Sequence, residues 1–241
     1  MLLAIERSAK AASAALYEVD ALPPVGHAIS PDLVRCRAFL QDEADGCGDA
    51  YPLVARLLHQ ANATPDDLSA FAVGVGPGSF SGIRAALALL RGLAAPRHIP
   101  VVGVNSAAAA AYAYRSANPG APRPIRVLGD ARHSHIWCFT EPDDPTSLVH
   151  TAQDIRLYSR TEAKPGQDPL PPVAELTALA QNPDAAPILL ADPVRLAPLF
   201  PQALPAHADA NGIAALALAG LYNPDADPIY LHPAVFGAPS P

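Results

Sequence analysis

The sequence predicts an α/β protein with two lobes, each containing a mixed sheet flanked by helices. In both halves of the chain, strand-like segments come first and helices then alternate with strands, which is the order found in α/β folds. A glycine-rich loop in the first half joins an apolar run to a stretch rich in alanine and leucine, as at a strand–turn–helix junction. At 241 residues the chain can bury a large core, in one large domain or in two lobes.

The first half is predicted to begin with a β-hairpin. Residues 2–8 and 11–19 are short, strand-like and separated by two residues, and we expect a third strand near 25–30. Residues 33–48 carry several acidic residues and glycines, so we expect a loop or a frayed helix there. The remaining elements follow in order: helix 50–61 with an apolar face of Leu53, Val54, Leu57 and Leu58, a short turn at residues 64–67, strand 69–75, helix 81–95, strand 100–104 and helix 106–117.

Prolines organise the second half of the chain. Of the 28 prolines, 20 follow residue 118, and they alternate with apolar segments rather than forming one low-complexity tract. We therefore interpret them as parts of loops between short elements, with residues 233–241 as the one candidate for a disordered tail. The predicted elements are strands near 125–131, 135–141 and 186–191, and helices near 172–181 and 209–221.

The composition argues against several classes of protein. The net charge is −7 and the 16 lysine and arginine residues are scattered, which disfavours a broad nucleic-acid-binding surface. No apolar stretch reaches membrane-spanning length, and the chain enters a strand without a basic leader, so we expect a cytoplasmic protein that does not bind membranes. Cys36, Cys47 and Cys138 include no Cys-x-x-Cys pair, and we interpret them as buried or incidental thiols in a reducing compartment.

The glycine-rich loop is the most informative segment. It could hold an anion, because the first amides of the following helix are free, or it could be a structural strand–helix turn, which the spacing alone favours. No Lys-Ser/Thr pair follows the last glycine, so it is not a Walker loop. The glycines allow positive φ or close backbone approach, the proline fixes the turn, and either serine can cap the helix. These residues are Gly76, Pro77, Gly78, Ser79, Ser81 and Gly82.

This loop resembles the signature of the TsaB (YeaZ) family. The specific match is Gly-x-Gly-Pro-Gly-Ser-Phe-Ser-Gly-x-Arg over residues 74–84, with Ser81 where the family usually has threonine. Weaker matches occur in the expected order along the chain. They are the first hairpin around Leu3-Ala4-Ile5, the segment Asp130-Ala131-Arg132, and Pro228-Ile229-Tyr230-Leu231, where His232 replaces an arginine. The resemblance is clear over residues 1–141, weak over 142–208, and present again near the end.

The resemblance implies the actin-like ATPase fold, shared with sugar kinases and Hsp70. It implies a first lobe over 1–105, a second lobe over 106–222, and a C-terminal segment, 223–241, that returns to the first lobe. The implied function is that of a subunit without catalytic residues or a cofactor, which helps a TsaD-like partner to form N6-threonylcarbamoyladenosine in tRNA. By the same resemblance, a TsaE-like ATPase takes part indirectly, tRNA is bound only through the complex, and the chain alone forms a homodimer.

Four charged residues are candidates for the cleft between the lobes. In active members of the fold that the resemblance implies, the first hairpin carries a carboxylate that approaches phosphate and metal. Glu6 takes that place here, and the bulky Arg7 follows it. We favour the interpretation that both are solvated charges at the hairpin tip, which weakens an ATPase or kinase assignment. Asp130 and Arg132 share a predicted strand face, where they form a local surface pair or order the glycine loop or a ligand.

Two histidines and the family's older label were considered as signs of other chemistry. His133 and His135 share a predicted strand face at a spacing that can bind metal, but without a third ligand nearby we favour surface or packing roles. The sequence contains no His-Glu-x-x-His and no Gly-x-Ser-x-Gly motif, so the older glycoprotease-like label has no residues to support it. We assign no catalytic residue and no metal ligand.

The helix predicted over 81–95 is apolar nearly all round, which is typical of a helix buried on two sides. Composition alone slightly favours a helix enclosed in its own lobe, whereas the resemblance implies that it pairs with another protein. The predicted interface residues are Leu53, Leu57, Arg84, Ala88 and Arg91. Two alternatives remain open: a phosphotransferase of the same fold that uses ATP and magnesium, and a free-standing homodimeric binding protein.

Overall fold

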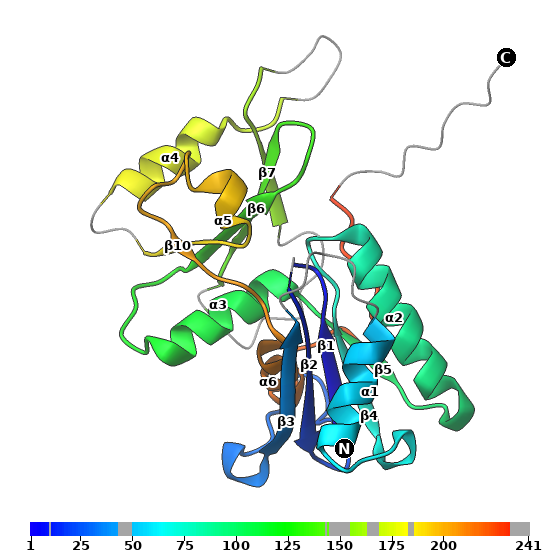
Figure 1. Ribbon diagram of the computed structural model, residues 1–241. Coiled ribbons are helices and arrows are strands. Elements are labelled where there is room, and N and C mark those ends of the chain that lie inside the picture. The colour runs from blue at the N-terminus through cyan, green and yellow to red at the C-terminus, as the bar shows by residue number, and fades with distance from the viewer. Residues whose placement is uncertain are drawn as a thin grey trace, which may run out of the picture.

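Two five-stranded mixed sheets form the centres of the two lobes in the computed structural model (Figure 1). The structure describes residues 1–9, 11–42, 50–142, 144, 155–162, 169–182 and 186–231. In sheet order, the first sheet consists of β3 (Arg35–Asp42), β2 (Ala12–Glu18), β1 (Leu2–Glu6), β4 (Ala70–Gly74) and β5 (Val101–Val104). The second consists of β8 (Ile155–Ser159), β7 (His135–Thr140), β6 (Arg126–Asp130), β9 (Ile188–Leu190) and β10 (Leu204–Pro205).

The two sheets repeat one topology. In each sheet the first three strands of the chain form an antiparallel meander, and the next two strands are added in parallel beside the first. The central strands β1 and β4 are buried on both faces, which explains their continuous apolar sequences. The predicted division into two α/β lobes is therefore confirmed.

The third strand of the first sheet does not lie where the sequence predicts it. The segment predicted as a strand, 25–30, is a loop in which the Gly26 amide donates to the Gly220 carbonyl at 2.9 Å. β3 lies instead within 33–48, where a loop or frayed helix is predicted. It pairs only with β2, and its first three residues are exposed, so it lacks the apolar alternation that identifies a half-buried strand.

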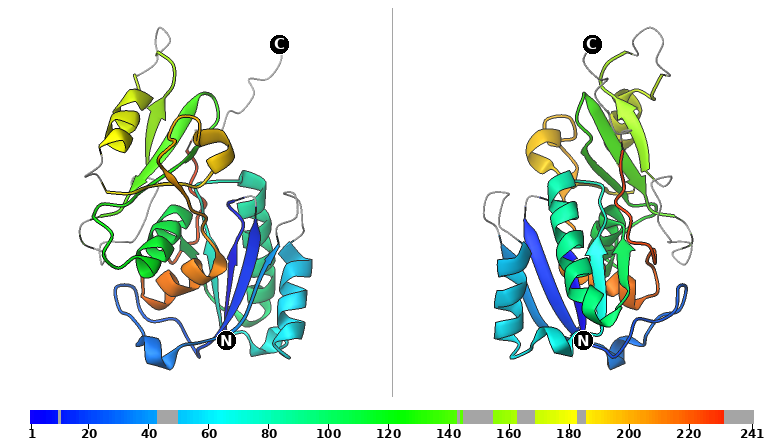
Figure 2. Two further views of the ribbon diagram at one scale, coloured as in Figure 1. Left: turned by 60° about the vertical axis from the view of Figure 1, so that its left-hand side comes forward. Right: turned by 90° about the vertical axis from the view of Figure 1, so that its right-hand side faces the viewer.

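Helices cover both faces of the first sheet (Figures 1 and 2). α1 (Ala50–Gln60) and α2 (Phe80–Ala94) contact the sheet and each other, and α6 (Ala210–Leu218) packs on the opposite face against β1, β2, β4 and β5. The helices predicted at 50–61, 81–95 and 209–221 are thus confirmed to within a few residues.

The apolar face of α1 belongs to the core of the first lobe. Leu53 is 2% exposed and Leu57 is fully buried, and both lie in the main apolar cluster of the protein. The prediction that these two leucines form part of a partner interface is therefore wrong. Their helical spacing fits a core-facing stripe and an interface equally well, so the sequence could not separate the two.

The second sheet lies between two layers of helix. Its outer face packs against α4 (Val173–Gln181) and the short α5 (Pro193–Leu196), forming a small separate apolar cluster. Its inner face joins the main cluster, and α3 (Ser106–Ala117) contacts both β6 and α6. Sequence analysis did not predict β8, β10 or α5, which are short and lie among prolines.

The chain returns to the first lobe earlier than predicted. Because α6 packs on the first sheet, the return begins by residue 210 rather than at 223. After α6, Asn223 pairs with Gly103 at the edge of β5, and the Ile229 amide donates to the Val75 carbonyl at 2.9 Å. Among the described residues, no helix has both the length and the hydropathy needed to cross a membrane.

Candidate functional site

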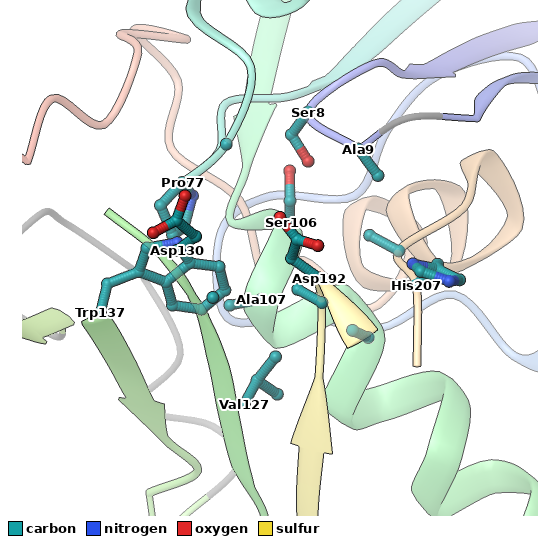
Figure 3. A pocket seen from close by; sticks show the side chains of 15 residues that line it. Ser8, Ala9, Pro77, Ser106, Ala107, Val127, Asp130, Trp137, Asp192 and His207 are labelled. Atoms are coloured by element: carbon teal, nitrogen blue, oxygen red, sulfur yellow. The ribbon is translucent and has the colours of Figure 1, made fainter. Parts of the chain in front are cut away.

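A pocket lies where the two lobes face each other (Figure 3). Including its open mouth, it encloses about 460 Å³. Ser8 and Pro77 line it from the first lobe, Asp130 and Asp192 from the second, and Ser106 lies at the start of α3. The glycine loop and the first hairpin therefore meet the second lobe at this pocket. Of the four candidate residues of the cleft, Asp130 lines the pocket, whereas Glu6, Arg7 and Arg132 do not.

The glycines of the loop are required for two different reasons. Gly76 has a φ of +94°, a left-handed conformation that other residues adopt only with strain. Gly78 and Gly82 have no positive φ; a Cβ at Gly78 would lie 2.2 Å from the Ser8 carbonyl oxygen, and one at Gly82 would lie 2.2 Å from that of Arg7. Close backbone approach, rather than a left-handed turn, therefore excludes a side chain at these two positions.

The tip of the first hairpin packs against the glycine loop and forms a backbone hydrogen bond with it. The Ser79 amide donates to the Ser8 carbonyl at 2.6 Å, and the Ser79 hydroxyl caps α2 by accepting from the Gly82 amide at 3.3 Å. Ser79 is thus the capping residue, one of the two serines that the sequence proposed. At a helix N-terminus, an amide such as that of Ser79 could bind an anion. Here it binds the chain's own backbone, which favours the structural interpretation of the loop.

Glu6 lies inside the protein, at the end of β1. Its side chain is fully buried; one carboxylate oxygen accepts from the Ser8 amide and the other from the Ser106 hydroxyl at 2.6 Å. The Ser106 hydroxyl in turn accepts from the Gly76 amide at 3.1 Å. Burial raises the pKa of the Glu6 carboxyl above its ordinary value, and the hydrogen bonds from Ser106 and Ser8 oppose this shift. The carboxylate therefore joins β1, the glycine loop and α3.

The interpretation of Glu6 and Arg7 as solvated charges at the hairpin tip is wrong. Arg7 is only 9% exposed, and its carbonyl packs against Gly82 at the start of α2. Two charged residues followed three positions later by a lysine are typical of an exposed turn, so nothing in the local pattern indicated burial. The start of α3 makes the burial of Glu6 less costly, because a helix N-terminus stabilises negative charge.

These contacts allow a test of whether a nucleotide with magnesium fits the loop. A phosphate–metal site needs unpaired amides in the loop and a carboxylate that faces the metal. In the described part of the chain, the Ser79 amide is bound to Ser8, and both carboxylate oxygens of Glu6 are bound within the protein. The residues present therefore do not fit a nucleotide–metal site at the glycine loop.

The second-lobe side of the pocket carries a cluster of charges. Asp130 ends β6 and forms ion pairs with Arg195, with Arg160 at 3.7 Å and with Arg132 at 4.0 Å. Asp130 lines the pocket, whereas Arg132 does not line it and its side chain is 69% exposed. The structure thus places Asp130 at the cleft, as one of the two interpretations expected. Arg132 does not share its strand face, because β6 ends at Asp130.

The histidine pair is also arranged differently from the prediction. His133 lies in the turn after β6 with a φ of +47°, and His135 is the first residue of β7, so the two do not share a strand face. No group of three or more metal-ligating side chains occurs among the described residues. Of the cysteines, Cys36 is exposed and Cys138 is buried, and Cys47 lies outside the described residues.

The outer face of α2, part of the predicted partner interface, is exposed. Ala88 and Arg84 are exposed, as is Arg91, which lies 4.0 Å from Asp227 in a weak ion pair. The face is built from small residues, and a Cβ added at Gly92 would meet nothing within 4 Å. Three of the five predicted interface residues therefore lie on an accessible surface.

Sequence analysis missed an exposed aromatic pair beside this face. Phe80 is 54% exposed and Tyr230 is 52% exposed, and their ring centroids are 5.4 Å apart. The Arg84 guanidinium lies 5.0 Å from the centre of the Phe80 ring. Both aromatic residues lie inside the segments that carry the family resemblance, so each was considered as part of a motif rather than as surface.

Comparison of the sequence with known proteins gives matches to TsaB and TsaD proteins. Residues 49–159 match the family model described as TsaD: tRNA N6-adenosine threonylcarbamoyltransferase. Over 99 residues the chain is 30% identical to the tRNA threonylcarbamoyladenosine biosynthesis protein TsaB of Escherichia coli (strain K12), covering 41% of this chain and 42% of that protein. Over 102 residues it is 35% identical to the tRNA N6-adenosine threonylcarbamoyltransferase of Paracoccus denitrificans (strain Pd 1222), covering 42% and 28%. These alignments span less than half the length of the curated relatives.

The likeness to solved structures extends over both lobes. YeaZ from Pseudomonas aeruginosa superposes with a TM-score of 0.60 at 24% identity, covering 95% of this chain and 99% of that one. A second crystal structure, of an uncharacterized protein with similarity to peptidase YEAZ from Pseudomonas aeruginosa, gives a TM-score of 0.61 at 20% identity, covering 96% and 99%. Together with the repeated sheet topology, this likeness confirms the predicted two-lobed α/β fold and shows that YeaZ shares it.

We predict that Gly78 does not tolerate a side chain. Gly78→Ala should lower the free energy of unfolding by about 1–3 kcal/mol, and Gly78→Val by more, because the added atoms overlap the Ser8 carbonyl. The control is Gly92→Ala, which has open space around its Cβ and should be neutral or stabilising by about 0.5–1 kcal/mol. Urea unfolding followed by circular dichroism measures both changes. Equal stability of Gly78→Ala and the parent would show that the hairpin does not press on the loop.

We also predict a pH dependence that arises from Glu6. Because the folded-state pKa of Glu6 is raised above its unfolded value, its contribution to stability is fully present below the unfolded pKa and is lost as pH rises through the folded pKa. Glu6→Gln cannot titrate, so the stability of the parent relative to this variant should fall as the pH rises above the ordinary pKa of a glutamate, about 4.3. Urea unfolding at a series of pH values measures the difference, with Glu175→Gln, at an exposed site on α4, as the control. A constant difference would contradict the assigned burial.

Proposed function

Because this chain belongs to the TsaD/YeaZ (TsaB) family, we propose that it is a non-catalytic subunit that binds a TsaD-like partner and supports the formation of N6-threonylcarbamoyladenosine in tRNA. A role without catalysis is supported chiefly by one observation: the hairpin tip binds the glycine loop through the Ser8 carbonyl and the Ser79 amide. The segment that would hold a phosphate in an active ATPase is thereby used to join two parts of the first lobe.

The docking surface we propose is the outer face of α2. Ala88 and Gly92 carry little or no side chain, so a partner helix could approach closely along this stripe. Arg84 and Arg91 flank it and would face acidic groups of the partner. The exposed Phe80 ring, stacked near Tyr230, extends the surface at one end of the helix; aromatic and arginine side chains are the usual energetic centres of interfaces.

Other proteins would carry out the remaining steps. A TsaD-like subunit would carry out the transfer to adenosine, and a TsaE-like ATPase would take part only indirectly. The chain alone would form a homodimer through the same face of α2, so that homodimer and heterodimer compete for one surface. We place this complex in the cytoplasm, where tRNA is modified.

Substitution of Ala88 tests the proposed function. Ala88→Arg should weaken association with the TsaD-like protein of the same cell by about tenfold or more, because a long charged side chain would separate the two helices and be buried unpaired. Light scattering of the chain alone and pull-down with the partner measure the two assemblies. Ala178→Arg, at an exposed alanine of α4, is the matched control and should leave both unchanged.

A second variant distinguishes the effect of a substitution in the core from that of a substitution on the proposed docking surface. Leu57→Ala should lower the free energy of unfolding by about 2–5 kcal/mol, since Leu57 is fully buried in the first lobe. Ala88→Arg should instead retain the stability of the parent, because Ala88 is exposed. If Ala88→Arg left both the dimer mass and the pull-down unchanged, the partner surface would lie elsewhere on the protein.

A further inference from the structure

The arginine cluster around Asp130 contains more positive charge than the carboxylates next to it require. Arg132 comes from the turn after β6, Arg160 follows β8 and Arg195 lies in α5. All three guanidinium groups lie within 4.0 Å of the one Asp130 carboxylate, and Arg195 also lies 3.5 Å from Asp192. Among the described residues, the cluster therefore has three positive and two negative groups, and both negative groups line the pocket.

Two of the three arginines are held loosely. Arg195 makes the close contact with Asp130, whereas Arg160 lies at 3.7 Å and Arg132 at 4.0 Å, near the limit of an ion pair. Their side chains are 33% and 69% exposed. A guanidinium group has five N–H donors, in a planar arrangement that matches phosphate. Arg132 and Arg160 thus expose N–H donors to solvent. Their ion pairs with the Asp130 carboxylate limit how far the two side chains can move.

The turn that carries Arg132 is strained. Residues 132, 133 and 134 have φ values of 64°, 47° and 64°, and none of them is glycine. Left-handed conformations at such residues cost about 1–3 kcal/mol each, and strained backbone of this kind is often found at ligand-binding sites. The Arg160 amide donates to the Ser134 carbonyl at 2.9 Å, which fixes the turn against the end of β8. This backbone hydrogen bond therefore joins the segment that carries Arg132 to the segment that carries Arg160.

The direction of the charges indicates how an anion would approach. The carboxylates of Asp130 and Asp192 line the pocket beside Ser106 (Figure 3), so a polyphosphate inside it would face negative charge. Arg132 and Arg160 do not line the pocket; both contact Asp130 and are partly exposed to solvent. This arrangement favours a phosphate that passes outside the mouth of the pocket over one that enters the pocket as part of a nucleotide.

We propose that Arg132 and Arg160 bind a backbone phosphate of an RNA strand that lies across the mouth of the pocket. The inference rests on the proposed function, in which the complex acts on tRNA. It requires one local contact rather than a broad basic surface, which is consistent with the net charge of −7. The second lobe would thus position RNA, while the first lobe binds the partner protein.

The experiment measures binding of an unmodified, fluorescently labelled tRNA transcript by anisotropy. It uses the chain alone at low salt and the chain with its TsaD-like partner over a range of salt concentrations. Arg132→Gln should weaken binding about tenfold and reduce the slope of log K against log salt by about one, and Arg160→Gln should act in the same direction. Arg156→Gln, at an exposed arginine of β8 outside the cluster, is the matched control and should bind like the parent.

Nucleotide binding is measured in parallel through the fluorescence of Trp137, the single tryptophan, which lines the pocket. If the parent, Arg132→Gln and Arg160→Gln bound RNA equally well, both as the chain alone and as the complex with the partner, the inference would be overturned. ATP binding that is lost in Arg132→Gln while RNA binding is unchanged would also overturn it, and would assign the cluster to a nucleotide. Failure of the chain to associate with the partner would reject the proposed function, and the measurement on the chain alone would then decide the RNA contact.

Discussion

The hydrogen bond between the Ser79 amide and the Ser8 carbonyl is the constraint on which the first lobe depends. It brings the tip of the first hairpin against the loop between β4 and α2, so that Gly78 and Gly82 meet backbone atoms and cannot carry a side chain. The same contact determines where α2 begins, since Ser79 also caps the helix. A loop that could have held an anion is instead a joint between strand, loop and helix.

Glu6 extends this joint to the second lobe. A buried carboxylate is costly, and here hydrogen bonds from the Ser8 amide and the Ser106 hydroxyl offset that cost. Because Ser106 begins α3, which contacts both β6 and α6, the same side chain connects the loop to the helix between the lobes. The segment between β4 and α2 is thus held by hydrogen bonds within the protein at both Gly76 and Ser79.

The sequence predicted most of the architecture, and its errors have physical causes. Strands buried on both faces and helices with one apolar stripe were placed to within a few residues, because burial imposes their pattern. β3 was missed because it is an edge strand with exposed residues at its start. Leu57 was assigned to an interface because an apolar stripe shows that one face of a helix is buried, but it does not show whether the same lobe or another protein covers that face. The burial of Glu6 depends on Ser106, a hundred residues away along the chain, which no local pattern records.

The most direct test of the central claim is the amide resonance of Ser79, followed by nuclear magnetic resonance while ATP and magnesium are added. The account predicts that this amide is already protected from hydrogen exchange by its bond to the Ser8 carbonyl, and that its chemical shift does not change with nucleotide. A large, saturable shift of the Ser79 amide, with matching shifts at Gly78, would show that the hairpin tip leaves the loop to make room for phosphate. It would contradict the conclusion that the loop is a structural joint.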